Sequence, residues 1–423
     1  MANRSSMFPM IIIGILFFIF GFVTWLNGSL IPFLKVICDL NEFQALFVTF
    51  AFYIAYTVMA LPMAYVLERT GYKDGMAIGL GVMVVGSLLF IPAALSANFI
   101  LFLLALFTLG TGLTILQTAS NPYVVLVGPI ESAAMRISIM GLINKSAGVL
   151  VPILFTALIL SDIGTLSSEL SHAEIEELSN RLIVPYIVMA IVLSGLIGLV
   201  KFSNIPELEF EKEDKHTKTS ILHFPRIVLG AVALFFYVGI EVIAGDTIGL
   251  YAQGLDVANA TALTSYTMVF MVFGYLVGVI FIPKYLSQEK ALIGSALSGI
   301  LLLLFVAFSS TTSHGVSEVL WGWSGILTLP NSVTFVALLG FANALVWPTI
   351  WPLALEGLGK YTAKGSALLI MAIAGGAILP LVFGKVAELL GDMQSAYLVG
   401  IVCYVFILMF ALKWHKMSSW SSR

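Results

Sequence analysis

The sequence predicts an all-α membrane protein with twelve transmembrane helices. Hydrophobic residues make up 60% of the 423 positions, and charged residues make up only 10%. A soluble domain carries about 25% charged residues, so this chain has too few for a large water-facing surface. Its apolar residues also fall in long runs, and about 20 such residues are enough for a helix to cross the bilayer core. Lipid offers no partners to backbone N–H and C=O groups, so each run must be helical.

Charged and turn-rich stretches separate twelve apolar runs. The first run is too long for the hydrophobic part of a signal peptide and has no small-residue cleavage site, so we interpret it as a retained span. The two cysteines lie far apart, which argues against a disulfide framework or a metal cluster. The predicted spans cover residues 8–34, 44–67, 76–95, 98–127, 137–161, 182–200, 225–253, 262–283, 290–309, 332–355, 366–390 and 393–412.

The distribution of lysine and arginine predicts the orientation of these spans. If the N-terminus lies inside, 16 basic residues fall in cytoplasmic segments, whereas only Lys35, Arg181 and Lys385 fall outside. Cytoplasmic loops carry an excess of Lys and Arg, so we expect both termini in the cytoplasm.

The longest charged stretch between spans follows the sixth one and divides the chain in two. We predict an N-terminal six-helix bundle over residues 1–200, a cytoplasmic linker over 201–224 and a C-terminal six-helix bundle over 225–423. On the outside, the acidic segment 167–180 is typical of a short surface helix.

Three ionisable side chains fall deep inside predicted spans: Lys145, Glu241 and Asp246. At 1.5 Å per residue, Lys145 lies roughly 14 Å beyond Arg136, and Glu241 lies roughly 22 Å beyond Arg226. Charges at this depth cost about 2.5–3.5 kcal/mol each even on the mildest scale, so they face the protein interior and find partners. We expect Lys145 to pair with Asp246 or Glu241, with Asp246 favoured. The alternative is a fixed salt bridge that binds nothing.

The loop between the second and third spans carries a recognisable motif. It reads "ERTGYKDG" over residues 68–75, with Glu68, Arg69 and Lys73 in a tight turn. This loop resembles the signature of the major facilitator superfamily, and the segment 283–291 is a degraded copy of it in the second half. The resemblance implies two pseudo-symmetric six-helix bundles and a gating role for the three charged residues.

A narrower resemblance extends over nearly the whole chain. The sequence is similar to the fucose/galactose/glucose symporter family of bacterial sugar transporters. That family implies uptake of a monosaccharide by alternating access, coupled to a cation, in a bacterial inner membrane. The blocks that carry the resemblance are "LNGSLIPFLK" (26–35), "LQTASNPYVVLVGP" (116–129), "SAAMRISIMGLINKSAG" (132–148), "YVGIEVIAGD" (237–246) and "WPTIWPLALEGLGKYTAKGSALLIMAIAGGAILP" (347–380).

The chain departs from this family at positions that matter for coupling. Proton-coupled members carry an acid where this chain has Gly28 and a second acid where it has Gln117. A family glutamine is replaced by Gly141, while the asparagine is kept as Asn144. The coupling cation therefore stays open between Na⁺ and H⁺.

Several outcomes remain possible for the ion and the partners. A Na⁺ site near Asp246 and Glu241 is one possibility, and a sugar uniporter in which Lys145 stands in for the cation is another. The sugar and the stoichiometry are also open. We expect no other cofactor, no nucleic acid and no enzymatic activity, and we expect a monomer whose partners are the sugar and the lipid bilayer.

A sugar needs directional partners for its hydroxyls and flat apolar faces for its C–H surface. Buried amides either bond neighbouring helices or line a wet cavity. Trp347 and Trp351 are four residues apart and share one helix face. The candidate sugar ligands are Trp25, Asn27, Gln117, Asn121, Asn144, Asn343, Trp347 and Trp351.

Overall fold

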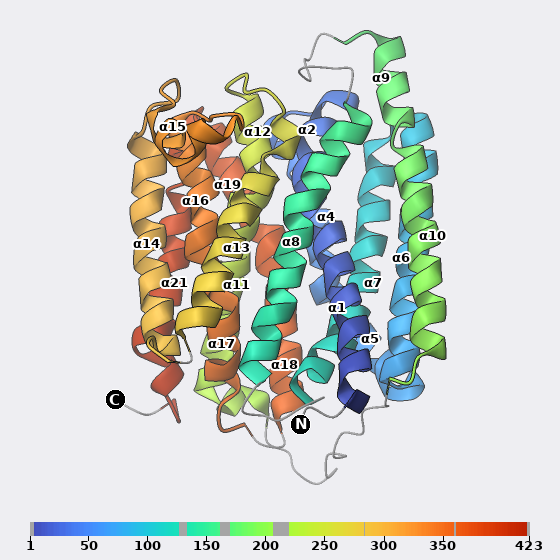
Figure 1. The fold of residues 1–423 in the computed structure, drawn as a ribbon, viewed down its shortest axis with the longest axis vertical. Coiled ribbons are helices and arrows are strands. Elements are labelled where there is room, and N and C mark those ends of the chain that lie inside the picture. The colour runs from blue at the N-terminus through green and yellow to red at the C-terminus, as the bar shows by residue number, and fades with distance from the viewer. Residues whose placement is uncertain are drawn as a thin grey trace.

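The computed structural model describes residues 4–126, 133–160, 170–205, 220–282, 284–358 and 361–420. Every regular element in these residues is a helix (Figure 1). Eleven helical segments among them are long and apolar enough to cross a membrane. Glu42–Val58 and Ala60–Thr70, bent by 50° at Met59, add a twelfth span. These twelve spans confirm the predicted fold class.

The first six spans form the N-terminal group of helices. Span 1 joins α1 to α2, span 2 joins α3, α4 and α5, and span 6 joins α9 to α10. The bounds are α1 Arg4–Trp25, α2 Asn27–Ile37, α3 Glu42–Ala45, α4 Phe47–Val58, α5 Ala60–Thr70, α6 Tyr72–Ser96, α7 Phe99–Leu126, α8 Ala133–Ile159, α9 His172–Asn180 and α10 Ile183–Phe202.

The last six spans form the C-terminal group. Span 7 joins α11 to α12, span 10 joins α16 to α17, and span 11 joins α18 to α19 through a 3₁₀ turn, η6. The bounds are η2 Ile221–His223, α11 Pro225–Asp246, α12 Ile248–Gln253, η3 Ala260–Ala262, α13 Thr264–Phe281, α14 Gln288–Phe308, α15 Gly315–Trp321, η4 Gly322–Ser324, α16 Asn331–Ala344, α17 Val346–Leu355, α18 Thr362–Met371, η6 Ala372–Ala374, α19 Gly375–Leu390, α20 Met393–Ala396, α21 Val399–Leu412 and η7 Trp414–Lys416.

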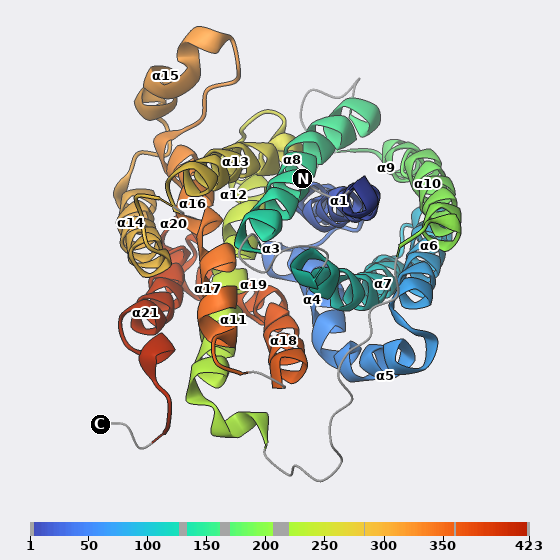
Figure 2. The same cartoon turned by 60° about the horizontal axis from the view of Figure 1, so that its bottom comes forward.

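Both chain termini lie at the same end of the molecule, which we call the terminal face (Figure 1). The other end, where α9, α12 and α15 lie, is the opposite face. The two groups of helices meet along three lines of contact: α8 packs on α13, α4 packs on α19, and α2 packs on α12 and η3. Figure 2 shows the groups side by side from the terminal face. An even number of spans accounts for the shared end of the termini.

Hydrogen bonds tie the two groups together at the opposite face. Ser29 Oγ donates to the carbonyl of Thr261 at 2.6 Å, and the hydroxyls of Thr156 and Thr261 lie 2.7 Å apart. Gln253 Nε2 donates to the carbonyl of Pro32 at 3.3 Å. The groups are therefore closed against each other at this face.

Besides the bend of span 2 and the 3₁₀ turn of span 11, three further spans break within their membrane-crossing length. Span 1 breaks at Leu26, span 7 at Thr247 and span 10 at Leu345. In span 10, Pro348 has no N–H to donate to the carbonyl of Ala344, so one helical hydrogen bond is missing beside the break. Broken spans commonly form the binding sites of transporters because they expose backbone and polar side chains at mid-membrane depth.

The segments that were predicted to lie outside the spans match their predictions only in part. Of the acidic segment 167–180, residues from His172 onward form α9, and Ser171 and Glu174 cap its start reciprocally. Residues 161–169 and most of the linker, 206–219, lie outside the described residues.

Candidate functional site

An ion pair joins the two groups of helices inside the membrane span. Lys145 Nζ on α8 lies 2.6 Å from Glu241 Oε1 on α11. Tyr237, one turn before Glu241, donates its hydroxyl to the same oxygen at 2.9 Å. On its other side, the amine lies 4.2 Å from the centre of the Trp25 ring, a cation–π contact. One amine thus holds a carboxylate from one group and an indole from the other.

This pair is almost enclosed, because the side chains of Lys145 and Glu241 are only 9% and 10% exposed. Taking two charges out of water costs several kcal/mol per ion, and their attraction offsets this only when the geometry is good. A buried pair is therefore weak evidence for stability. Removing one partner alone is costly, about 3–5 kcal/mol, because it strands the other charge. The arrangement favours a role in function.

Asp246 does not join this pair. It lies five residues after Glu241, at the last position of α11, and it is fully buried. Neither of its carboxyl oxygens has a hydrogen-bond partner among the described residues. In this conformation Lys145 therefore pairs with Glu241 and not with Asp246, the partner that we favoured from the sequence. An ideal helix turns residues five apart by about 140°, so only one of the two acids can face α8 directly.

Asn144 holds the indole in place beneath the amine. Its Oδ1 accepts a hydrogen bond from Trp25 Nε1 at 3.3 Å, and its Nδ2 donates to the carbonyl of Phe17 at 3.4 Å. Trp25 is only 1% exposed. In this conformation Asn144 joins α8 to α1. The Trp25 ring contacts the Lys145 amine and is not exposed to an open cavity.

The amides of span 4 lie farther from the ion pair. Gln117 Nε2 donates to the hydroxyl of Tyr56 on α4 at 2.9 Å. Asn121 follows Gln117 by four residues on α7 and is also half-buried. Residues four apart share one helix face, so both amides lie on the same side of α7.

Asn343 and Asn27 have unused hydrogen-bonding capacity. Tyr404 donates its hydroxyl to Asn343 Oδ1 at 2.7 Å, while Asn343 Nδ2 has no partner among the residues that the structure describes. Asn27, at the start of α2, is 1% exposed, and neither end of its amide is paired within the described structure. Unpaired buried amides are expensive, so each of these two side chains calls for an explanation other than packing.

The two tryptophans of span 10 extend the site away from the ion pair. The Trp347 and Trp351 rings lie 5.5 Å apart at 45°, and Trp347 also lies 6.4 Å from the ring of Tyr237. Tyr237 is the same residue that donates to Glu241. The aromatic surface on α17 is therefore connected to the ion pair through one tyrosine.

Among the described residues, unpaired buried polar atoms lie on spans 1, 4, 7 and 10, and also on span 6 at Asn180 and Tyr186. Asn27, Asp246, Asn343 and the indole N–H of Trp351 belong to the predicted set, and Ser120 on α7 is an addition. In a packed interior most buried polar groups are paired, so each exception calls for a bound ligand or a functional reason. Spans 1, 4, 7 and 10 each carry at least one such atom within the described residues.

The turn between spans 2 and 3 lies at the terminal face. Glu68 and Arg69 are exposed near the end of α5, and the Arg69 guanidinium lies 4.3 Å from the ring centre of Tyr65. Lys73 Nζ donates to the carbonyl of Ser203, at the end of α10, at 2.7 Å. The turn thus links spans 2 and 3 to span 6.

Sequence reasoning missed Tyr237, and a signal for it was present. Tyr237 precedes Glu241 by four residues, so its hydroxyl shares a helix face with the carboxylate.

As for metals, no group of three or more His, Cys, Asp or Glu side chains comes together within the part of the chain that is described.

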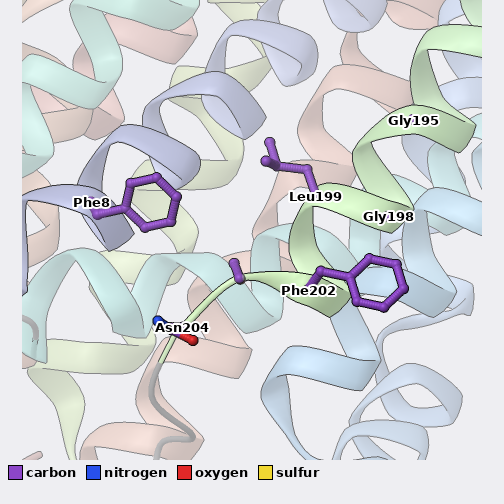
Figure 3. A pocket seen from close by; sticks show the side chains of 7 residues that line it. Phe8, Gly195, Gly198, Leu199, Phe202 and Asn204 are labelled. Atoms are coloured by element: carbon purple, nitrogen blue, oxygen red, sulfur yellow. The ribbon is translucent and has the colours of Figure 1, made fainter.

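A separate groove opens on the outer surface between α1 and α10, toward the terminal face (Figure 3). Phe8, Leu199 and Phe202 line it, together with Gly195 and Gly198. Its lining carries no charged side chain. This groove is unconnected with the residues predicted for the site.

A model of the Major Facilitator Superfamily matches residues 13–380. The chain belongs to this superfamily. It is 34% identical over 419 residues to a glucose/galactose transporter of Brucella abortus, covering 97% of this chain and 95% of that one. It is 27% identical over 431 residues to the L-fucose-proton symporter of Escherichia coli, covering 97% and 93%.

Solved structures agree with this assignment. The fold matches a crystal structure of the Escherichia coli fucose:proton symporter FucP with a TM-score of 0.72 and 25% identity, covering 96% of this chain and 98% of that one. A second structure of FucP, in the outward conformation, matches with a TM-score of 0.73, covering 96% and 99%. The predicted family is confirmed, and the chain is a multi-pass transporter rather than an enzyme.

Proposed function

We propose that the protein transports a monosaccharide of the glucose, galactose or fucose type by alternating access. The names of its relatives support the substrate class. In this proposal residues 1–200 and 225–423 are the two moving bundles, and residues 201–224 are the linker between them. The closed contacts at the opposite face place this conformation among those that are sealed on that side.

The observation that carries the proposal is the ion pair between Lys145 and Glu241, because it joins the two bundles. Rocking one bundle against the other must stretch or exchange this contact. A permanently fixed bridge would oppose that motion, whereas a contact that finds another partner in each state would guide it. We therefore assign Lys145, Glu241 and Asp246 to ion coupling.

The charges of these three groups sum to −1 when all are ionised. One bound Na⁺ or H⁺ makes the set neutral, and a neutral set crosses between states at lower cost. The relatives named proton symporters favour H⁺. A uniporter in which Lys145 replaces the cation is the alternative, and the buried position of its amine is the observation that favours it.

The sugar site of this proposal lies on spans 1, 4, 5 and 10. Unpaired amide atoms would bond hydroxyls, and the Trp347 and Trp351 rings would cover a C–H face of the sugar. Trp25 and Asn144, which now contact each other, would become ligands only in another state. The full set is Trp25, Asn27, Gln117, Asn121, Asn144, Asn343, Trp347 and Trp351.

The remaining assignments follow from the orientation predicted by charge. The terminal face is the cytoplasmic side of a bacterial inner membrane, so Glu68, Arg69 and Lys73 gate the cytoplasmic end. The protein acts as a monomer. Charged residues in such a turn can hold one state through contact with helix dipoles.

Uptake by proteoliposomes tests the function. Purified protein is reconstituted, and entry of labelled glucose, galactose and fucose is followed with no gradient, with an inward Na⁺ gradient and with an inward H⁺ gradient. A symporter accumulates one of these sugars above its external concentration when the correct gradient is present. A uniporter only equilibrates the sugar. Absence of protein-dependent entry of all three sugars contradicts the proposal.

A further inference from the structure

Asp246 is a carboxyl group without any partner in the middle of a membrane protein. It is fully buried, and neither of its oxygens accepts a hydrogen bond within the described residues. An isolated ionised carboxylate is very costly in such surroundings, and a group in this position takes up a proton instead. The enclosure alone therefore favours the neutral acid in this conformation.

The charged groups around Asp246 lead to the same result. The charged groups that interact with it electrostatically are Glu241 from its own helix and Lys145 from α8, and the neutral phenol of Tyr53 on α4 also lies within range. The amine of Lys145 is already engaged by Glu241 at 2.6 Å. A second negative charge beside Glu241 would be left without compensation. With a proton on Asp246, the three charges of the cluster sum to zero.

A sodium ion fits this position poorly. Transporters often hold Na⁺ with the carbonyls of a broken helix, and span 7 breaks just after Asp246. The backbone carbonyls at this break already accept hydrogen bonds from three threonine hydroxyls. Thr247 donates to Ile243 at 2.6 Å, Thr267 to Ala244 at 3.2 Å and Thr264 to Gly245 at 2.7 Å.

We propose that the coupled cation is a proton, carried on the carboxyl group of Asp246, while Lys145 and Glu241 remain ionised. This inference rests on the proposed function and specifies its ion and the atom that holds it. The carboxylate takes up one H⁺ when the site faces the side of higher proton concentration. The O–H bond breaks again when the site faces the other side and Lys145 comes close enough to stabilise the carboxylate. Each cycle therefore moves one proton and leaves the residue unchanged.

The first test needs no sugar. Infrared spectra of the reconstituted full chain are compared with those of Asp246→Asn and of the control Asp256→Asn. Asp256 lies ten residues further on, is exposed and has a positive φ of 55° that asparagine tolerates. We expect the carbonyl stretch of a protonated carboxylic acid at neutral pH in the wild type and in the control, and its loss in Asp246→Asn.

The second test measures proton movement directly. Proteoliposomes contain a pH-sensitive dye and Na⁺-free buffer, and a sugar that the uptake assay has identified is added outside. We expect sugar-driven acidification of the interior in the wild type and in Asp256→Asn, and a loss of acidification and of uphill accumulation in Asp246→Asn.

The two tests separate the inference from the proposed function. If no sugar enters at all, the proposed function fails, and the infrared band still decides whether Asp246 holds a proton. If sugar enters with Na⁺ and without acidification, the function stands and the inference is overturned. Acidification that persists in Asp246→Asn, or an infrared band that this substitution leaves in place, also overturns it.

Discussion

The amine of Lys145 lies 2.6 Å from Oε1 of Glu241, and this contact joins α8 of one helix group to α11 of the other. The same oxygen accepts the hydroxyl of Tyr237, whose ring lies near Trp347. Tyr237 therefore lies between the ion pair and the aromatic ring of Trp347. A ligand that shifts Trp347 would act on the carboxylate that holds the two groups together.

Replacement of the lysine should abolish transport. Lys145→Ala leaves the Glu241 carboxylate buried without its partner, and we expect a stability loss of about 3–5 kcal/mol and no accumulation of sugar. Thermal unfolding in detergent and proteoliposome uptake measure the two effects. Lys385→Ala is the matched control, because its pair with Glu388 is half exposed and contributes ~0–1 kcal/mol.

The double variant Lys145→Ala with Glu241→Gln separates stability from function. It removes both charges together, so most of the lost stability should return while transport stays absent. Wild-type accumulation in either variant would show that the pair is only structural.

Removal of the Tyr237 hydroxyl should weaken the hold on Glu241. Hydrogen bonds to charged groups contribute about 1.5–3 kcal/mol, so Tyr237→Phe should be less stable by that amount and should alter the rate of uptake. Tyr186→Phe is the control, because the Tyr186 hydroxyl is buried without a hydrogen-bond partner among the described residues. That change should leave stability the same or raise it. Equal effects of the two substitutions would contradict the role given to Tyr237.

The tryptophan pair on α17 should determine sugar affinity. Loss of a ring face in Trp347→Ala should raise the KM for the transported sugar about tenfold, which corresponds to about 1.4 kcal/mol. Uptake at increasing sugar concentration measures this change. Trp323→Ala, at a ring that is 84% exposed on η4, should leave the KM unchanged. An unaltered KM in Trp347→Ala would show that the sugar does not bind against this ring.

The sequence was sufficient to predict the twelve spans and the depth of the buried charges. Both follow from physical requirements of the bilayer, because length and hydropathy define a span and the rise per residue defines depth. Counting residues could place Lys145 and Glu241 well inside the bilayer core. Their contact at 2.6 Å required something more, namely which way each helix is turned.

Helix rotation and helix breaks explain what could not be predicted. Glu241 and Asp246 differ by about 140° around an ideal helix, and hydropathy does not say which of them faces α8. The break at Thr247 begins directly after Asp246. Ideal helix geometry therefore does not give the direction of the Asp246 side chain. The contact between Asn144 and Trp25, two of the predicted sugar ligands, also depends on helix rotation and could not be predicted from the sequence.

Close packing between helices should make Gly375 intolerant of any side chain. A Cβ atom at this position would lie 1.8 Å from the carbonyl oxygen of Phe235 on α11, and backbone cannot move aside as a flexible side chain can. Gly375→Ala should therefore reduce folded protein sharply in expression and size-exclusion measurements. At Gly198 a Cβ meets nothing within 4 Å, so Gly198→Ala should be about 0.5–1 kcal/mol more stable. Similar yields of the two variants would contradict the packing at Gly375.

Cysteine labelling tests the orientation that the basic residues predict. Lys385 lies near the opposite face and Lys413 near the terminal face, and both are exposed. In intact cells, a membrane-impermeant maleimide should label Lys385→Cys and should reach Lys413→Cys only after the membrane is opened. The native Cys38 should interfere little, because burial raises the pKa of its thiol to about 12 and the thiolate is the reactive form.

The outcome of this labelling also bears on the direction of transport. The hydrogen bonds of Ser29 and Thr156 to Thr261 close the opposite face, so external labelling of Lys385→Cys would make the present conformation one that is sealed toward the outside. In that state a cysteine at Ser29 should be protected from external reagent, whereas a conformation open to the outside should expose it. Protection that decreases on addition of the transported sugar would show that the seal opens during the cycle. Labelling of Lys413→Cys before Lys385→Cys in intact cells would reverse the predicted orientation, and the gate assigned to Arg69 and Lys73 would then lie on the outer side.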